Sequence, residues 1–464
     1  MTEKINKIKK KKKINVIVCA ALSALVLCFA GCSSSPKAEK DAWYEENSKD
    51  FSLYTLKNGI PVIFKKTNGG QVFVLRTVFE GGTPLVSREF AGIESLTLEM
   101  MFHGSKKFSY EDIQNMQYAV SFSMNHSSGR DYSVTGIKCL QKDLDTVLEV
   151  YADSIISPAF LKEDFNQLLL NTEDSIQRTM AEPDGQLAME LEKAAFGNSA
   201  YSSPAQVTEE SIKKMTLEAL KTHHKKLLDA GRIKFVIVAN MESEVQQNLV
   251  EKLDGLFGQI QPQGYKRPEI PKIAVEGEDL FIKNEQAGTA GYSVGFFDCP
   301  ERYDEDYVPF ALALMFLDDI FFDQVREKAG AVYSVGTGVL GGRQMLGAVS
   351  AYKISDLQNI HSLIEKAMLD FPDEKNLAGK LEQYKNKYIT TLFESSQSGT
   401  GVAANIITSL EYSGKPDTYL KRSAQVQNVT AKQVYEAYKK YLAPDTKTKK
   451  IRWITVASGM LIPF

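Results

Sequence analysis

The sequence predicts an α+β protein made of two homologous domains, and three observations support this prediction. A helical pattern at residues 215–228 aligns position for position with one at residues 429–442. In both copies an apolar strand pattern rich in β-branched residues follows this helix. In both copies a strand, an amphipathic helix and a long charged helix precede it in the same order. One order of elements that occurs twice indicates one domain that occurs twice.

The first copy begins with a strand pattern at Tyr132. An amphipathic helix is expected over about residues 144–156, and a long charged helix over about residues 161–180. The repeated helix is expected to begin after Thr216, because a threonine hydroxyl can accept a hydrogen bond from a free backbone N–H of the first turn.

The second copy repeats this order. A strand pattern begins at Leu346, and helices are expected over about residues 357–369 and 374–394. Thr430 occupies the place of the N-cap before the second copy of the repeated helix. The strand that ends this copy begins at Trp453.

The boundary between the two domains is predicted where proline and glycine are concentrated. Residues 261–276 are interpreted as a linker, because these residue types interrupt helices and strands. The N-terminal domain then covers residues 51–260 and the C-terminal domain residues 277–464. The residues that indicate the break are Pro262, Gly264, Pro268 and Pro271.

The first residues have the pattern of a secretory signal. A basic segment precedes an apolar run over residues 14–30, and small residues and Cys32 follow it. This resembles a bacterial lipobox, so residues 1–31 are predicted to be a signal peptide and Cys32 the lipid attachment site. Residues 32–50 are polar and are predicted to form a tether. The protein would then be an exported bacterial lipoprotein that faces the periplasm or the cell exterior; a plain signal peptide or an uncleaved anchor helix is the alternative.

The amino-acid composition and net charge limit the kinds of molecule that the protein is expected to bind. The chain has 464 residues, of which 43% are hydrophobic, and a net charge of −3. Removal of residues 1–31 takes away seven lysines and one glutamate, so the mature chain is more acidic than the whole. An acidic, exported chain argues against nucleic acid as a partner. Cys139 and Cys299 stand alone in the two halves and are expected to be core thiols.

Several motifs of the first half resemble the N-terminal homology domain of the pitrilysin/insulinase family of zinc peptidases. One is a predicted helix over residues 92–105, whose two ends are marked by Gly92 and Gly104. The others begin at Tyr54 (YTLKNGIPVI), Phe79 (FEGG), Ser128 (SGRDYS) and Phe160 (FLKEDF). The resemblance implies that each domain is a mainly antiparallel sheet with helices packed on it. It also implies that the two domains form a clamshell that closes on a peptide.

The family carries an H-x-x-E-H motif between these two glycines. Its histidines bind Zn²⁺ and its glutamate is the general base for the metal-bound water. Alignment on the glycines places Ser95 and Glu99 at the histidine positions and Leu98 at the glutamate position. The third zinc ligand of the family falls on Ser175, which Glu173 and Asp174 directly precede. The sequence therefore resembles a member that has lost the zinc motif, and no metal, cofactor or catalytic residue is predicted.

The histidines elsewhere offer no replacement, because no pair has zinc-ligand spacing with a carboxylate base between them. Glu99 and His103 are spaced for one helix face, but two ligands are too few for zinc. His126 is expected beside an edge strand, in an exposed loop or against a bound peptide. His223 and His224 are expected at a helix surface and the edge of the core.

One motif of the family is present in the second half. The segment REKAGAVY, from Arg326 to Tyr333, resembles the R-E-x-x-G-x-x-Y motif of the family. The resemblance implies that Arg326 and Tyr333 bind the substrate backbone, and both side chains are suitable donors to carbonyl oxygens. The alternative is an arginine that caps its helix and a tyrosine in the core.

These observations predict a zinc-peptidase homologue that is not catalytic on its own. It would be the substrate-binding subunit of a heteromeric metalloendopeptidase whose partner is an active, zinc-bearing homologue. One alternative is a stand-alone peptide-binding or scaffolding lipoprotein. The other is an active metallopeptidase that uses shifted ligands such as Glu99, His103 and Glu173.

Overall fold

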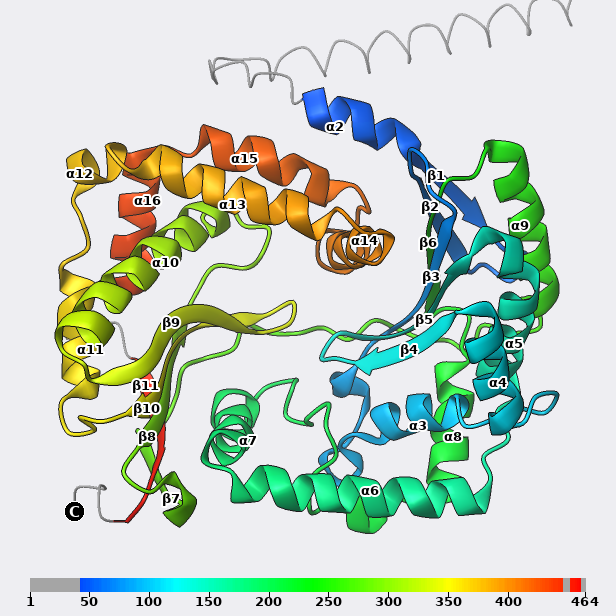
Figure 1. Ribbon diagram of the computed structural model, residues 1–464, viewed down its shortest axis with the longest axis horizontal. Coiled ribbons are helices and arrows are strands. Elements are labelled where there is room, and N and C mark those ends of the chain that lie inside the picture. The colour runs from blue at the N-terminus through cyan, green and yellow to red at the C-terminus, as the bar shows by residue number, and fades with distance from the viewer. Residues whose placement is uncertain (1–41, 445–450, 460–464) are drawn as a thin grey trace, which may run out of the picture. The chain divides into compact units, whose positions relative to one another are not determined.

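The computed structural model describes residues 42–444 and 451–459 of the chain (Figure 1). The predicted signal peptide, Cys32 and residues 32–41 of the predicted tether lie outside the described residues. In the described part, strands form two sheets and helices pack on them, so the prediction of an α+β fold with two domains is confirmed. None of the described helices is long and apolar enough to cross a bilayer.

The first sheet has six strands in the order β1-β2-β6-β3-β5-β4. All neighbouring pairs are antiparallel except β2 and β6, which run parallel. The sheet is therefore mainly antiparallel, as the family resemblance implied. Its strands are β1 (Phe51–Thr55), β2 (Pro61–Lys66), β3 (Val72–Glu80), β4 (Ser123–Ser128), β5 (Tyr132–Leu140) and β6 (Ile233–Ala239).

The second sheet has five strands in the order β7-β11-β8-β10-β9, and only β7 and β11 run parallel. Its strands are β7 (Leu280–Lys283), β8 (Gly291–Asp298), β9 (Val332–Gly341), β10 (Met345–Ile354) and β11 (Arg452–Ala457). In each sheet, the strand that follows the repeated helix has one parallel and one antiparallel neighbour. The two sheets thus repeat the same topology, as the repeated sequence pattern predicted.

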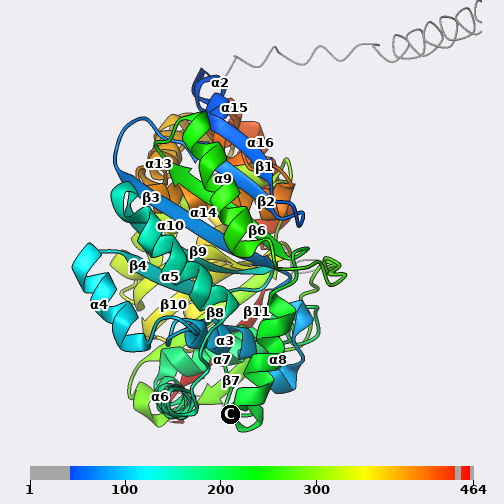
Figure 2. The same ribbon diagram turned by 90° about the vertical axis from the view of Figure 1, so that its right-hand side faces the viewer.

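Two helices cover one face of the first sheet, as Figure 2 shows. They are α5 (Leu144–Ile156) and α9 (Ser243–Phe257). Alternate residues of β3, namely Phe73, Leu75 and Phe79, are fully buried in the core beneath them. Side chains alternate between the two faces of a strand, so these residues account for one face of β3.

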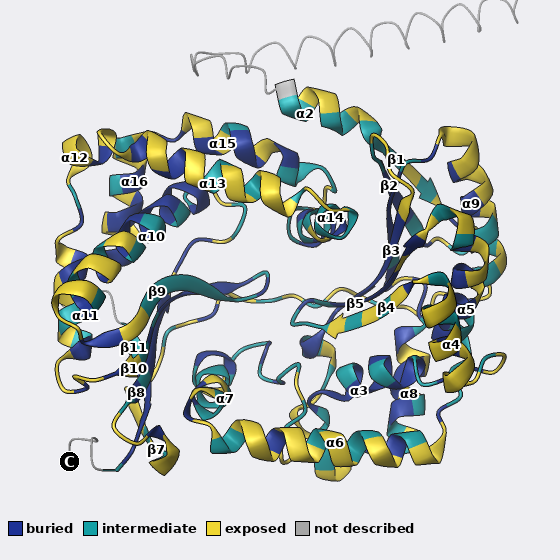
Figure 3. Cartoon of the chain, viewed as in Figure 1, coloured by how far each residue is buried: buried dark blue, intermediate teal, exposed yellow. Residues whose placement is uncertain are grey.

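A helix from the C-terminal half covers the opposite face of the same sheet. The intervening β3 residues Val74 and Val78 are also fully buried, and they pack against α14 (Gly399–Ser413) through side chains such as Ile406. Nearly the whole of β3 is therefore buried (Figure 3). The two halves share a core, because a helix of one half closes a sheet of the other.

The long charged helix has different forms in the two halves. In the first half it is one helix, α6 (Lys162–Ala181), close to the predicted range. In the second half, two helices replace the single helix predicted over residues 374–394, namely α12 (Glu374–Ala378) and α13 (Leu381–Ser395). Gly379 lies at the break, and glycine favours a helix end because it has much backbone freedom to lose inside a helix.

The remaining helices complete the two halves. They are α2 (Ala42–Asn47), α3 (Ile93–Met101), α4 (Tyr110–Val120), α7 (Pro183–Phe196), α8 (Leu217–Leu227), α10 (Tyr307–Phe321), α11 (Ile360–Leu369), α15 (Arg422–Asn428) and α16 (Ala431–Ala437). The repeated helix is α8 in one half and α16 in the other. The hydroxyls of Thr216 and Thr430 accept hydrogen bonds from the backbone N–H groups of Ala219 and Gln433, so both predicted N-caps are confirmed.

The predicted tether is wrong for residues 42–50, which fold against the body of the protein. The ring of Trp43 lies 5.3 Å from that of Phe393, and the Tyr44 hydroxyl donates to Asp417 at 2.8 Å. The carboxylate of Asp50 accepts a hydrogen bond from Lys65 Nζ on β2 at 2.8 Å. The aromatic side chains of this segment stabilise it by packing against the body of the protein, although most of its residues are polar.

Candidate functional site

Helix α3 lies between the two glycines of the family resemblance. Gly92 has φ of 78° and Gly104 has φ of 91°, values that favour glycine. A Cβ at Gly92 would lie 2.3 Å from the backbone N of Val207, so the close approach of these segments requires glycine there. The helix lies beside α8 and the edge strand β4. The predicted helix over residues 92–105 is thus present, but it ends at Met101, before Gly104.

The three positions aligned with the zinc motif carry side chains in three different settings. Leu98 is fully buried in the core beneath α5 and α9, and Ser95 is half-buried. The Glu99 side chain is 42% exposed and faces β4, where Nε2 of His126 lies 2.8 Å from its Oε2. Nε2 of His103 lies 3.5 Å from Oε1 of the same carboxylate. Two imidazoles therefore contact a carboxylate at the position where the family has a histidine.

These contacts keep Glu99 ionised. Hydrogen bonds from His103 and from His126 hold the pKa of Glu99 well below its ordinary value, although partial burial opposes this effect. The His103 ring also stacks on Tyr110 with 4.7 Å between centroids, which fixes its orientation. Glu99 is consequently engaged by two imidazoles and is not a free carboxylate available for proton transfer.

The predicted third position lies on α6. Ser175, Glu173 and Asp174 are all exposed, and Asp174 pairs with Arg178 one turn along the same helix. Within residues 42–444 and 451–459, no group of three or more His, Cys, Asp or Glu side chains is placed to hold a metal ion. With Leu98 in the core as well, the residues present do not fit the catalytic zinc of the H-x-x-E-H motif.

A buried charge cluster lies one turn before Glu99 on α3. The Glu94 carboxylate accepts a hydrogen bond from the hydroxyl of Ser133, and its Oε2 lies 3.1 Å from Nε2 of His223 and 3.3 Å from Nη2 of Arg232. Burial raises the pKa of Glu94, but the hydrogen bond from His223 and the charge of Arg232 more than offset burial and hold the pKa at about 2. This cluster links α3, β5 and α8. Each of these partners is more than thirty residues from Glu94 in sequence, so no local pattern predicted the cluster.

The expected positions of His223 and His224 need correction. Both side chains are buried rather than at a helix surface. His223 contacts Glu94, and His224 has Nε2 2.8 Å from the backbone O of Ile155. Burial lowers the pKa of His224 and favours its neutral form. Each histidine thus contacts a buried acceptor that the helical pattern alone does not reveal.

The edge strand β4 carries His126 and pairs with β5 alone among the described strands. Its residues alternate, so that Ser123, Asn125 and Ser127 are exposed while His126 is half-buried and faces Glu99. His126 therefore lies in the edge strand itself, rather than in a loop beside it. An edge strand of this kind can add an extended peptide through backbone hydrogen bonds.

Arg326 and Tyr333 lie together on the C-terminal half. Arg326 is in a π-helical turn, Phe322–Lys328, and Tyr333 is in the edge strand β9. The guanidinium carbon lies 5.4 Å from the tyrosine ring centroid, and Tyr333 is 66% exposed. The alternative of a core tyrosine is thus wrong, and the pair presents donor groups to solvent.

A third side chain belongs to this surface. Nζ of Lys353 lies 5.4 Å from the Tyr333 ring centroid, so two cations flank one phenol. Lys353 has φ of 52° and occupies an irregularity in the pairing of β10 with β8, between Tyr352 and Ile354. A non-glycine residue in this conformation is uncommon and is held by its surroundings. No sequence motif marks Lys353, because its position depends on strand register.

Sequence models of one family match both halves of the chain. Residues 75–209 match the model described as insulinase (peptidase family M16), and residues 214–387 match the model of the peptidase M16 inactive domain. The chain belongs to peptidase family M16. The predicted membership of the pitrilysin/insulinase family is therefore confirmed.

The M16 chain is similar to proteins with different roles. It is 28% identical over 220 residues to mitochondrial-processing peptidase subunit alpha-1 of Dictyostelium discoideum, a match that covers 46% of this chain and 32% of that subunit. It is 21% identical over 284 residues to the non-peptidase homolog YmxG of Helicobacter pylori, covering 60% and 64% of the two chains. The crystal structure of a peptidase M16 inactive domain from Pseudomonas fluorescens superposes with a TM-score of 0.76 at 18% identity, over 88% of this chain and 98% of that one.

Proposed function

We propose that this M16 protein is a non-catalytic subunit that binds peptide or protein substrate and works with an active, zinc-bearing homologue. The observation that carries this proposal is the state of α3. Where the family has its general base, Leu98 is buried in the core, and where it has its second histidine, Glu99 is paired with His126 and His103. General-base catalysis by this family needs a carboxylate beside a metal-bound water, and α3 supplies neither.

Substrate binding in this proposal uses two surfaces. The backbone of β4 offers its free edge to an extended peptide, and Arg326 and Tyr333 offer donors to peptide carbonyl oxygens. Lys353 adds a second positive charge beside Tyr333. The names of the relatives support this role, since one is a subunit of a processing peptidase and another is a non-peptidase homolog.

The location of the protein is part of the same proposal. The basic and apolar leader over residues 1–31 and the cysteine at position 32 support export and lipid attachment. A lipid-anchored subunit would meet its partner and its substrate at a membrane surface that faces the periplasm or the cell exterior.

The isolated mature chain is expected to contain substoichiometric zinc and to leave casein intact, because α3 lacks the ligand set. Elemental analysis after incubation with zinc and desalting measures the first property, and a cleavage assay measures the second. The same assay on material co-purified through a tagged chain is expected to show cleavage that chelators abolish. Stoichiometric zinc in the isolated chain with chelator-sensitive cleavage would overturn the proposal. Co-purification without any peptidase homologue would favour a stand-alone peptide-binding protein.

Combined replacement of Arg326 by alanine and Tyr333 by phenylalanine is expected to weaken peptide binding by about tenfold or more, because hydrogen bonds that involve a charged group are lost. Fluorescence anisotropy with a labelled peptide measures this effect. Lys328→Ala is the matched control, because this exposed lysine of the same turn pairs with Asp323. Equal affinity in the double variant and the parent would remove Arg326 and Tyr333 from the proposed binding surface.

A further inference from the structure

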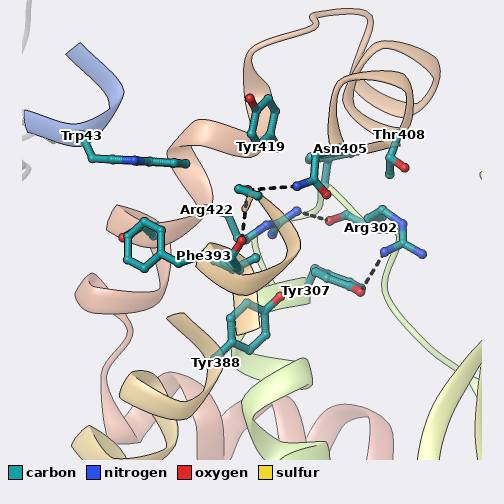
Figure 4. A pocket seen from close by; sticks show the side chains of 13 residues that line it. Trp43, Arg302, Tyr307, Tyr388, Phe393, Asn405, Thr408, Tyr419 and Arg422 are labelled. Carbon is teal, nitrogen blue, oxygen red and sulfur yellow. Dashed lines mark hydrogen bonds between the residues drawn. The ribbon is translucent and has the colours of Figure 1, made fainter. Parts of the chain in front are cut away.

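The C-terminal half contains a pocket that the proposed function does not use. Its volume is about 110 Å³, and six elements contribute to its walls, including the N-terminal helix α2 (Figure 4). Aromatic rings and two arginines dominate the lining. A space of this size exceeds what one water needs and suits a small organic molecule.

The two arginines lack an acidic partner among the described residues. Arg422 is 7% exposed and donates from Nη2 to the backbone O of Arg302 at 2.9 Å. Arg302 donates from Nη1 to the Tyr307 hydroxyl at 3.3 Å, while its Nε is buried and has no hydrogen-bond partner in the described structure. Neither guanidinium forms an ion pair with a described carboxylate, although the chain has many ion pairs elsewhere.

Arg422 is buried and Arg302 is half-buried, and removal of such cations from water is costly unless an anion or other groups compensate. Tyrosine rings compensate in part, since the guanidinium of Arg422 lies 5.1 Å from the rings of Tyr303 and Tyr307. The guanidinium of Arg302 lies 5.7 Å from the Tyr307 ring. A guanidinium has five N–H donors, and these contacts engage few of them. The unused donors match the oxygens of a carboxylate or a phosphate.

The wall formed by α2, α13 and the turn before α15 is apolar. Trp43 lies edge-on to Phe393, with 5.3 Å between the ring centroids, and edge-on to Tyr419 at 6.5 Å. Figure 4 shows Trp43 and Phe393 on one side of the pocket and Arg302 on the other, with Arg422 between them. The pocket therefore has an aromatic side and a cationic side.

We propose that this pocket binds a small organic anion, whose carboxylate or phosphate pairs with Arg302 and Arg422 and whose flat apolar part packs against Trp43. The proposal does not depend on the proposed subunit function, because the pocket shares no residue with β4, Arg326 or Tyr333. It gives α2 a role as a wall of a ligand site.

Tryptophan fluorescence provides a direct test, because the chain has two tryptophans and Trp453 is buried elsewhere in the second sheet. In a Trp453→Phe variant, benzoate and phenyl phosphate are each titrated while Trp43 emission is followed. A saturable change with one or both anions is expected, and the comparison identifies the preferred anionic group. The neutral analogue benzamide is expected to bind at least about tenfold more weakly. Calorimetric titration of the natural chain repeats the measurement without the substitution.

Arg302→Met is expected to weaken anion binding at least about tenfold, and Arg302→Lys is expected to retain more of it because the charge remains. Arg452→Met is the matched control. Arg452 also lies over an aromatic ring, that of Phe296, but it donates to backbone carbonyls outside the pocket. Absence of saturable binding of both anions to the natural chain would overturn the proposal. Benzamide affinity equal to that of the anions, or unchanged affinity in both Arg302 variants, would overturn it as well.

Discussion

Replacement of Glu94 by glutamine is expected to lower the free energy of unfolding by about 3–5 kcal/mol, because removal of one partner of a buried ion pair leaves the other charges uncompensated. Glu94 is 5% exposed and contacts Ser133, His223 and Arg232. A neutral amide at this position would leave the Arg232 guanidinium, which is 4% exposed, without its carboxylate. Urea unfolding near neutral pH, followed by circular dichroism, measures the change.

The same carboxylate should make the folded protein sensitive to acid. Its pKa of about 2 in the folded chain lies below the ordinary value of 4.5, so the folded state binds the proton less readily than the unfolded state. The stability contributed by Glu94 is then fully present above about pH 4.5 and is lost as the pH falls through about 2. The stability difference between parent and Glu94→Gln is therefore expected to shrink as the pH falls through this window.

Glu89→Gln is the matched control for both measurements, because Glu89 is exposed in the turn that precedes α3. Its effect is expected to stay within about 0.5 kcal/mol, as is usual for surface substitutions. A Glu94→Gln variant as stable as the Glu89→Gln control would show that the buried cluster does not stabilise the fold.

Local sequence patterns predicted the elements that depend on local physics. The amphipathic helix expected over residues 144–156 has those bounds in α5, and the two threonine caps are present. Cys139 and Cys299 are buried free thiols, as their isolation in sequence indicated. These features follow from side-chain periodicity and from hydrogen bonds within a few residues. The helix break at Gly379 was not predicted, because the charged helical pattern of the sequence continues across it.

The long-range contacts of the candidate site could not be predicted from local sequence patterns. Glu99 was identified as the residue at a vacant histidine position, but its pairing with His126 depends on how α3 meets β4. Lys353 lies opposite Tyr333 in the pairing of β10 with β9, and Trp43 contacts Phe393 across most of the length of the chain. Each contact joins segments that are far apart in sequence, and the periodicity of side chains within one segment does not show which distant segment it contacts. The family resemblance indicated where a candidate site lies, and the structure gives the contacts of the side chains there.

Replacement of Lys234 by methionine is expected to lower the free energy of unfolding by about 1.5–3 kcal/mol, because charged hydrogen bonds are lost while Arg267 still pairs with Glu411. Lys234 on β6 lies 2.6 Å from Oε1 of Glu411 on α14 and 3.3 Å from Oε2 of Glu80 on β3. The Glu411 side chain has no exposed surface. Burial raises the pKa of Glu411 and the charge of Lys234 opposes this, so loss of the lysine favours protonation of the glutamate. Denaturant unfolding measures the loss of stability.

The double variant Lys234→Met/Glu411→Met is expected to be less destabilised than Lys234→Met alone. Arg267 has Nε 2.9 Å from Oε1 of Glu80, so these two charges remain paired after both substitutions. Two apolar side chains in place of a buried ion pair are often close to neutral in stability, whereas Lys234→Met alone leaves the buried Glu411 carboxylate with only Arg267 Nη2, 3.3 Å away, as its ion-pair partner among the described residues. Lys57→Met is the control for loss of a lysine, because Lys57 is exposed and its pair with Asp254 is expected to contribute about 0–1 kcal/mol.

The structural consequence of Lys234→Met should appear at the junction between the two halves. Helix α14 packs on Val74 and Val78 of β3, and the ion pair between Lys234 and Glu411 lies on the same helix and sheet. Loss of that pair is therefore expected to increase hydrogen exchange in α14 and β6 more than in α5, which packs on the opposite face of the sheet. Equal exchange in the parent and the variant would mean that apolar packing alone holds α14 on the first sheet, and that the buried charges add nothing to the junction of the halves.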